Sequence, residues 1–150
     1  MKKTAGILLL MIILSCSSKE KIVKNISCEG NISVQYDRLK PKNSGIVSKQ
    51  NLQAFTVYFL YEFNDVIKGF VNNELKYEKK LNLSGSSDTL EEYFGYNYSK
   101  DSETPILKVI SETKKTCFDI RIDKRYKIIY VYFSKDGKWT IRFSNAYYTS

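Results

Sequence analysis

The chain has 150 residues, a formal net charge of +8 and no histidine. This length suffices for one domain and is too short for two of ordinary size. The lack of histidine excludes Ser-His-Asp triads, Cys-His pairs, imidazole-based metal sites and most schemes that need a general base.

The first 15 residues have the pattern of a cleaved secretory signal. Lys2 and Lys3 supply positive charge, and Ala5–Leu14 form an apolar run of ten residues. That run is about half of the ~20 residues that a membrane-spanning helix requires. We therefore expect residues 1–15 to be a signal helix that is removed from the mature chain.

The apolar run ends in a cysteine. The sequence Ile13-Leu14-Ser15-Cys16 resembles the lipobox of bacterial lipoproteins. The resemblance implies that Cys16 becomes the first residue of the mature chain and carries acyl groups such as palmitate. Several acyl chains on one residue anchor a protein stably, whereas one chain binds only marginally. The alternative is an ordinary secretory signal that happens to contain a cysteine.

Lipidation of Cys16 would place the protein in the cell envelope, on a membrane surface. Residues 16–28 then read as the lipidated cysteine and a flexible polar tether, and residues 29–150 as a β domain. The tether resembles those of surface-exported lipoproteins of the Bacteroidetes. Nucleic acid is not an expected partner there, so the basic charge points to acidic polysaccharide or anionic lipid. The alternative is that lysine-rich faces only keep the domain soluble.

Two cysteines remain once Cys16 is assigned to the anchor, Cys28 and Cys117. An even number of cysteines in a secreted chain favours a disulfide. The bond would tie the first strand to a late one across roughly 90 residues, the kind of long loop whose closure is expected to stabilise most. Two free thiols are the alternative.

The β domain opens with a predicted strand in "GNISVQYD", residues 30–37. The longer stretch "SCEGNISVQYD", residues 27–37, resembles the opening strand of small periplasmic inhibitors of C-type lysozyme. That resemblance implies a lipoprotein with a disulfide-tied antiparallel barrel. The family's inhibitory motif has no counterpart later in the chain, and a cationic lysozyme should prefer an acidic inhibitor.

Residues 53–83 predict three strands joined by two tight turns, Asn64-Asp65 and Asn72-Asn73. Alternation places five apolar residues of the first strand on one face: Phe55, Val57, Phe59, Tyr61 and Phe63. The turns would pair Phe63 with Val66, Phe59 with Phe70, Phe70 with Leu75 and Lys68 with Tyr77. The apolar residues of all three strands would then share one face, and Lys68 would be the exception on it. Lys68 would be either a snorkelling side chain or part of a ligand site.

Residues 84–105 are rich in turn formers, with a helical turn conceivable over residues 88–93. We expect four aromatic residues to lie in this polar loop, with a lysine beside them: Tyr93, Phe94, Tyr96, Tyr98 and Lys100. Tyrosines on loops are adaptable contact groups that stack on sugars or anchor protein partners. The alternative is that Phe94 and one tyrosine plug the end of the domain, while the others pair with Tyr147 and Tyr148.

The last part of the chain predicts strands in "ILKVI", "CFDIRI", "YKIIYVYF" and "KWTIRF". Asp136-Gly137 is a strong hairpin signal. With a two-residue turn, it places six residues on one face: Ile128, Tyr130, Tyr132, Trp139, Ile141 and Phe143. A three-residue turn at residues 123–125 would put Phe118, Ile120 and Ile122 on the same face. A two-residue turn at Lys124-Arg125 would put them on the opposite face, and we favour the three-residue turn.

About eight strands therefore predict an all-β domain, an antiparallel β-sandwich or small barrel. Glu91 and Glu92 are adjacent and would point to opposite faces of a strand, so they could not flank one bond. We expect no enzymatic activity, no cofactor and no metal. The expected role is binding of an envelope glycan or protein, and the alternatives are an inhibitor or immunity lipoprotein and an accessory subunit of an envelope complex.

Overall fold

The computed structural model describes residues 28, 30–39, 51–60, 63–83, 92–134 and 136–147. The described residues form nine strands and no helix, so none of them lies in a helix that could cross a membrane. The strands are β1 (Ile32–Tyr36), β2 (Ala54–Leu60), β3 (Asn64–Val71), β4 (Glu74–Asn82), β5 (Tyr93–Asn97), β6 (Ile106–Ser111), β7 (Thr116–Arg121), β8 (Ile128–Phe133) and β9 (Trp139–Ser144). The predicted signal peptide and almost all of the predicted tether lie outside the described residues.

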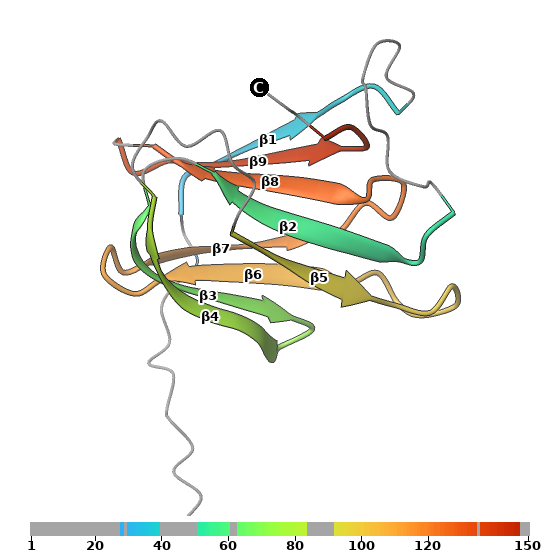
Figure 1. Ribbon diagram of the computed structural model, residues 1–150, viewed down its shortest axis with the longest axis horizontal. Coiled ribbons are helices and arrows are strands. Elements are labelled where there is room, and N and C mark those ends of the chain that lie inside the picture. The colour runs from blue at the N-terminus through green and yellow to red at the C-terminus, as the bar shows by residue number, and fades with distance from the viewer. Residues whose placement is uncertain are drawn as a thin grey trace, which may run out of the picture.

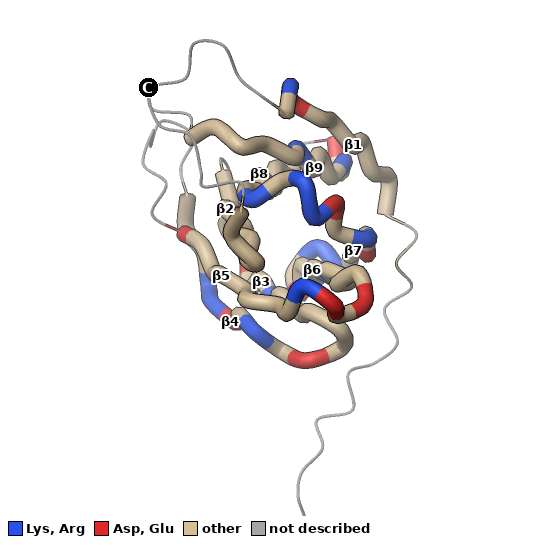
Figure 2. Tube along the Cα trace, turned by 90° about the vertical axis from the view of Figure 1, so that its right-hand side faces the viewer, with Lys and Arg blue, Asp and Glu red and all other residues tan. Residues whose placement is uncertain are grey.

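The strands build two sheets that face each other (Figure 1). One sheet has the order β1-β9-β8-β2-β5, and the other has the order β4-β3-β6-β7. Figure 2 shows the two layers from the side, with β5 next to β4. The predicted all-β sandwich is confirmed, and the sheets do not close into a barrel. The prediction that all strands pair antiparallel is wrong, because β1 pairs with β9 and β2 with β8 in parallel.

The core between the two sheets is rich in aromatic rings. Trp139 is fully buried, and its ring centroid lies 4.5 Å from that of Phe133, 5.1 Å from Phe118 and 6.2 Å from Phe63. Aromatic side chains bury large areas, and tilted or edge-to-face pairs add to the stability that burial provides. The core therefore joins strands of both sheets around one tryptophan.

The predicted hairpin at Asn64-Asp65 is wrong. Asn64 is the first residue of β3, Asp65 is buried, and β2 and β3 belong to different sheets. The core face of β3 therefore carries Ile67 and Val71, whereas the prediction placed Val66 and Phe70 there. Both sets are apolar, so alternation along β3 does not distinguish its inner from its outer face. The buried positions predicted for β2 are confirmed at Phe55, Val57 and Phe59, while Tyr61 is outside the described residues.

The predicted turn at Asn72-Asn73 is confirmed, with φ values of 52° and 67°. Phe70 pairs with Leu75 as expected, but Lys68 pairs with Glu78 and not with Tyr77. A register shift between Gly69 and Phe70 displaces the rest of the hairpin by one residue. The Lys68 ammonium forms ion pairs with Glu78, at 3.3 Å, and with Glu112. These ion pairs account for a lysine between the apolar residues Val66 and Phe70 on the outer face of β3.

Strands β6 and β7 pair antiparallel, but the hairpin predicted with its turn at residues 123–125 is wrong. β7 lies in the four-stranded sheet and β8 in the five-stranded sheet, so the turn carries the chain from one layer to the other. The Tyr126 amide donates to the Asp123 carbonyl within this turn, at 3.0 Å. Phe118 and Ile122 nevertheless enter the same core as β8, from the opposite sheet.

The predicted β8–β9 hairpin is confirmed, but its register differs by one residue. Gly137 adopts φ +80°, and the Ser134 amide donates to the Lys138 carbonyl at 3.0 Å. Closure at Ser134 and Lys138 gives a three-residue loop with glycine in the left-handed position, a common hairpin type. The partners of Trp139, Ile141 and Phe143 are consequently Phe133, Val131 and Ile129. Ile128, Tyr130 and Tyr132 lie on the outer face instead.

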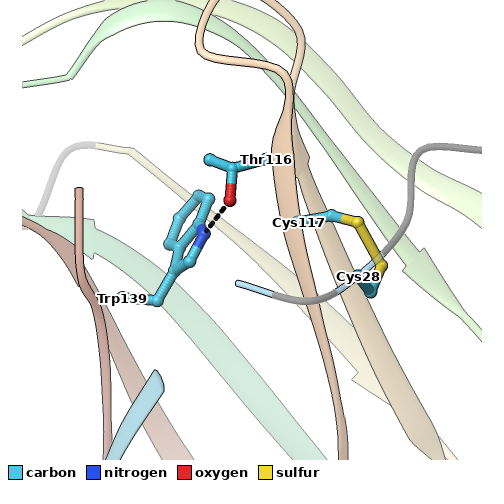
Figure 3. The surroundings of a disulfide bond; sticks show 4 residues. All are labelled: Cys28, Thr116, Cys117 and Trp139. Atoms are coloured by element: carbon cyan, nitrogen blue, oxygen red, sulfur yellow. Dashed lines mark hydrogen bonds between the residues drawn. A yellow bond between two sulfur atoms is a disulfide. The ribbon is translucent and has the colours of Figure 1, made fainter. Parts of the chain in front are cut away.

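The predicted disulfide between Cys28 and Cys117 is present, with Cα atoms 4.8 Å apart (Figure 3). It ties the chain just before β1 to β7 and so links the two sheets. Gly30 packs closely beside it, because a Cβ there would lie 2.5 Å from the Cys117 carbonyl oxygen. The Trp139 indole donates to the Thr116 hydroxyl at 3.3 Å in the same region. The sandwich is therefore cross-linked at the edge formed by β1 and β7.

Candidate functional site

The tyrosine-rich segment predicted as a polar loop is mostly a strand. Tyr93–Asn97 form β5, which pairs antiparallel with β2. Alternation along β5 buries Phe94, which is 7% exposed, and leaves Tyr93 54% exposed. The helical turn conceived for residues 88–93 is therefore wrong at Tyr93, and the preceding residues 84–91 lie outside the described ranges.

Phe94 is a core residue. It lies opposite Val57 in the sheet, and its ring centroid is 5.4 Å from that of Tyr77. Its ring also lies against Gly69, where an added Cβ would come within 2.8 Å. Phe94 therefore joins β5 to β4 across the sandwich and fits the alternative in which it plugs the domain.

Tyr96 and Tyr93 remain at the surface of this segment. The Tyr96 ring lies 5.6 Å from that of Phe55, and the Lys76 ammonium is 5.7 Å from its centroid. Tyr93 packs on Tyr58 on the outer face of the sheet, at 5.3 Å between centroids. Tyr58 also contacts Tyr147, with ring centroids 6.3 Å apart, so the tail packs on β2, whereas the alternative interpretation had paired it with the tyrosines of residues 93–98. Burial, with Tyr147 and Tyr93 nearby, raises the pKa of Tyr58 to about 12.

Tyr98 follows β5 and is buried between two lysines. The Lys127 ammonium donates to the Tyr98 hydroxyl at 3.2 Å and to the Lys124 carbonyl at 2.6 Å. The Lys124 ammonium lies 5.2 Å from the Tyr98 ring centroid and donates to the Ser102 carbonyl at 2.6 Å. We call Tyr98, Lys124 and Lys127 the lysine–tyrosine cluster.

Neither lysine of this cluster forms an ion pair with a carboxylate among the residues that the structure describes. The adjacent Asp123 instead pairs with Arg125, at 2.6 Å. The hydrogen bonds from Arg125 hold the pKa of Asp123 below its ordinary value. Lys127 is only 6% exposed, so its charge is stabilised by a carbonyl, a phenol and the nearby ring.

Lys100 lies in the exposed turn formed by residues 99–102, which is closed by hydrogen bonds from Ser102 to the Ser99 carbonyl. The same turn provides the Ser102 carbonyl that Lys124 contacts. The structure thus brings two of the five predicted site residues, Tyr98 and Lys100, to one end of the sandwich. It places the other three, Tyr93, Phe94 and Tyr96, along β5.

Sequence reasoning missed Lys124 and Lys127. The signal is present in the basic run "DKRYK", residues 123–127, which the sequence analysis divides between a turn at residues 123–125 and the start of the strand "YKIIYVYF". Ammonium and phenol groups donate hydrogen bonds, so a cluster of them is suited to anionic oxygens such as carboxylates and phosphates. The described residues contain no group of three or more cysteine, aspartate or glutamate side chains that could hold a metal ion.

No known protein family matches this chain, and no curated protein and no solved structure matches it either. The resemblance of residues 27–37 to lysozyme inhibitors implied an antiparallel barrel. The open sandwich and the parallel pairing of β1 with β9 depart from that architecture.

Proposed function

We propose that this protein is a lipid-anchored lipoprotein of the cell envelope, whose β-sandwich binds an envelope glycan or protein without catalysis. The anchor rests on the apolar run that ends at Cys16. The Cys28–Cys117 disulfide supports an oxidising compartment, because such bonds are rare where thiols are kept reduced.

The lysine–tyrosine cluster is the observation that carries the binding role. Two lysines without a carboxylate partner in the described structure surround one phenol, and Lys100 stands on the adjoining turn. An acidic polysaccharide offers the carboxylate oxygens that ammonium groups bind, and at this end of the sandwich Lys124 is partly exposed and Lys100 is exposed. We therefore propose acidic glycan as the preferred ligand class.

The anchor is tested by fatty-acid labelling in the producing cell. We expect the wild-type chain and the neighbouring control Ser18→Ala to incorporate the label, and Cys16→Ser to lose it. Label that persists in Cys16→Ser contradicts the assignment of Cys16 as the lipidated residue.

The ligand is tested by using the full chain as bait in an envelope extract, under oxidising conditions, with retained glycans and proteins identified by mass spectrometry. Lys124→Gln is compared with Lys80→Gln, an exposed lysine on β4. We expect acidic glycan to be retained by the wild type and by Lys80→Gln, and retention to fall in Lys124→Gln. A single stoichiometric protein partner would instead favour the inhibitor or immunity role.

A further inference from the structure

Strand β1 is an edge strand that carries no charged residue. It lies at one end of the five-stranded sheet and, among the described strands, pairs only with β9 (Figure 1). Its sequence is Ile-Ser-Val-Gln-Tyr. Natural proteins usually protect an exposed edge with lysine, proline, a bulge or a covering segment, because its free backbone groups pair with other chains.

The other three sheet edges are protected. β4 carries Lys76, Lys79 and Lys80, and β7 carries Asp119 and Arg121. β5 is uncharged, but its side chains pack on β4 through the Tyr77–Phe94 ring contact, and the adjoining Glu92 pairs with Lys79 at 2.6 Å. β1 is therefore the edge in the described sheets that carries no charge and whose apolar side chains stay exposed.

The open backbone groups of β1 belong to alternate residues. The Asn31 carbonyl accepts from Trp139, and the Asp37 amide donates to the Phe143 carbonyl, both at 2.9 Å. Because a parallel ladder uses alternate residues of a strand, Ser33 and Gln35 also direct their backbone groups to β9. The amides and carbonyls of Ile32, Val34 and Tyr36 point the other way.

The side chains of these same three residues face the core side of the sheet. They lie in register with Trp139, Ile141 and Phe143, which are fully buried. Ile32, Val34 and Tyr36 are nevertheless 41%, 36% and 57% exposed. The opposite sheet thus does not reach far enough to cover them, and an added strand would extend the apolar surface beside them.

We propose that two copies of this chain associate by pairing their β1 strands antiparallel about a two-fold axis at Val34. Val34 then lies opposite Val34 of the second copy, and Ile32 lies opposite Tyr36. Ile32, Val34 and Tyr36 are the residues whose backbone groups point away from β9. In this register they lie opposite one another across the axis, so all of them fall in hydrogen-bonded pairs. The isologous contact joins the two five-stranded sheets into one continuous sheet.

The second copy is favoured over another protein because the strand is self-complementary. Its pattern of apolar and polar residues is symmetric about Val34, and each Ile32–Tyr36 contact is an aromatic–β-branched pair. Each copy carries a charge of +8, yet no like charges oppose each other along this register. The flanking Asp37 faces Asn31 of the second copy and is held by Arg142 of its own chain, at 2.7 Å.

Sedimentation velocity of the full chain in a fixed detergent tests this proposal. We expect the wild type to shift from monomer to dimer as its concentration rises, and Val34→Lys to remain a monomer because it places two ammonium groups at the axis. The matched control is Leu75→Lys, at a 48% exposed residue on the β4 edge, which should behave as the wild type. A wild type that is monomeric throughout, or equal association of Val34→Lys, overturns the proposal.

Hydrogen exchange of the wild-type chain gives a second test that needs no variant. We expect the amides of Ile32, Val34 and Tyr36 to gain protection at high protein concentration, while those of β4 remain unchanged. Unchanged exchange in β1 overturns the proposal. Protection of β1 that appears only in an envelope extract also overturns it, because the occupant is then a different protein.

Discussion

At the scale of single residues, the buried Asp65 shows how one carboxylate holds a turn in place. Its oxygens accept hydrogen bonds from the Val66 amide at 2.6 Å, the Thr113 amide at 2.8 Å and the Ser111 hydroxyl. Burial acts to raise the pKa of Asp65, but these hydrogen bonds outweigh it and hold the pKa below its ordinary value of 3.8. Asp65 thereby joins β3 to the turn between β6 and β7.

Replacing Asp65 with asparagine should therefore destabilise the protein in a pH-dependent manner. A depressed pKa means that the carboxylate contributes fully above pH 3.8 and loses its contribution as the pH falls through the lower folded-state pKa. We expect Asp65→Asn to lower the free energy of unfolding by about 1–3 kcal/mol at pH 7. Urea unfolding at pH 7 and pH 3 measures this. The difference in the free energy of unfolding between Asp65→Asn and the wild type should be smaller at pH 3 than at pH 7. The exposed control Asp101→Asn should match the wild type at both pH values.

Two strand glycines provide a second test at this scale. A Cβ at Gly69 would lie 2.8 Å from the Phe94 ring, whose place is fixed by Tyr77 on one side. A Cβ at Gly95 would meet nothing closer than 3.9 Å. We expect Gly69→Ala to lower the free energy of unfolding by about 1–3 kcal/mol through overpacking. Gly95→Ala should leave it unchanged or raise it by up to about 1 kcal/mol, and equal effects in urea unfolding would contradict this packing.

At the scale of elements, the β3–β4 hairpin depends on its turn. Asn72 and Asn73 both adopt positive φ, as a two-residue hairpin turn requires. The Asn72 side chain also accepts a hydrogen bond from the Ile106 amide at 2.9 Å, so it holds the hairpin against β6. Asn73 is exposed and serves the turn through its backbone conformation.

Substitutions at Asn73 should follow the cost of positive φ. We expect Asn73→Val to lower the free energy of unfolding by about 1–2 kcal/mol, since a β-branched residue is disfavoured in the left-handed region. Asn73→Gly should preserve or slightly raise stability, because glycine adopts that region freely. Thermal and urea unfolding of both variants measure their stabilities. If Asn73→Val is as stable as Asn73→Gly, the hairpin does not depend on a positive φ at residue 73.

At the scale of the whole molecule, the two sheets are joined by aromatic packing at the core and by one covalent bond at the β1–β7 edge. The Cys28–Cys117 disulfide spans 89 residues of sequence. A cross-link over such a long loop removes much conformational freedom from the unfolded chain, while the Trp139 cluster stabilises the folded state. The edge that this bond secures is the one that carries the uncovered strand β1.

Loss of the disulfide should therefore have a large effect on stability. We expect reduction, or replacement of both Cys28 and Cys117 by serine, to lower the free energy of unfolding by about 4–5 kcal/mol, on the chain-entropy model. Urea unfolding with and without a thiol reductant measures this loss, and the double variant should not respond to the reductant. A wild-type protein whose unfolding is insensitive to reduction would show that the bond contributes little.

The sequence by itself determined the existence and type of most elements, because turn chemistry and strand alternation are local properties. Asn72-Asn73 and Gly137 lie where backbone angles demand such residues, and both turns are found in the structure. The pairing of Cys28 with Cys117 was predicted because only these two of the three cysteines remain once Cys16 is assigned to the anchor. The prediction of a loop around Phe94 was wrong, because the tyrosines and the glycine there follow a turn-rich segment and resemble it in composition. In the structure, buried and exposed residues alternate along this segment as in any strand.

Only the tertiary structure decided which strands are neighbours and which face of each strand is buried. β3 and β8 carry apolar residues on both faces, so their sequences fit either orientation, and the choice depends on the sheet that each strand joins. The lysine–tyrosine cluster arises in the same way, because Tyr98 and Lys127 are 29 residues apart and meet only when the two turns pack together. Such contacts result from burial across the whole sandwich, which no local pattern encodes.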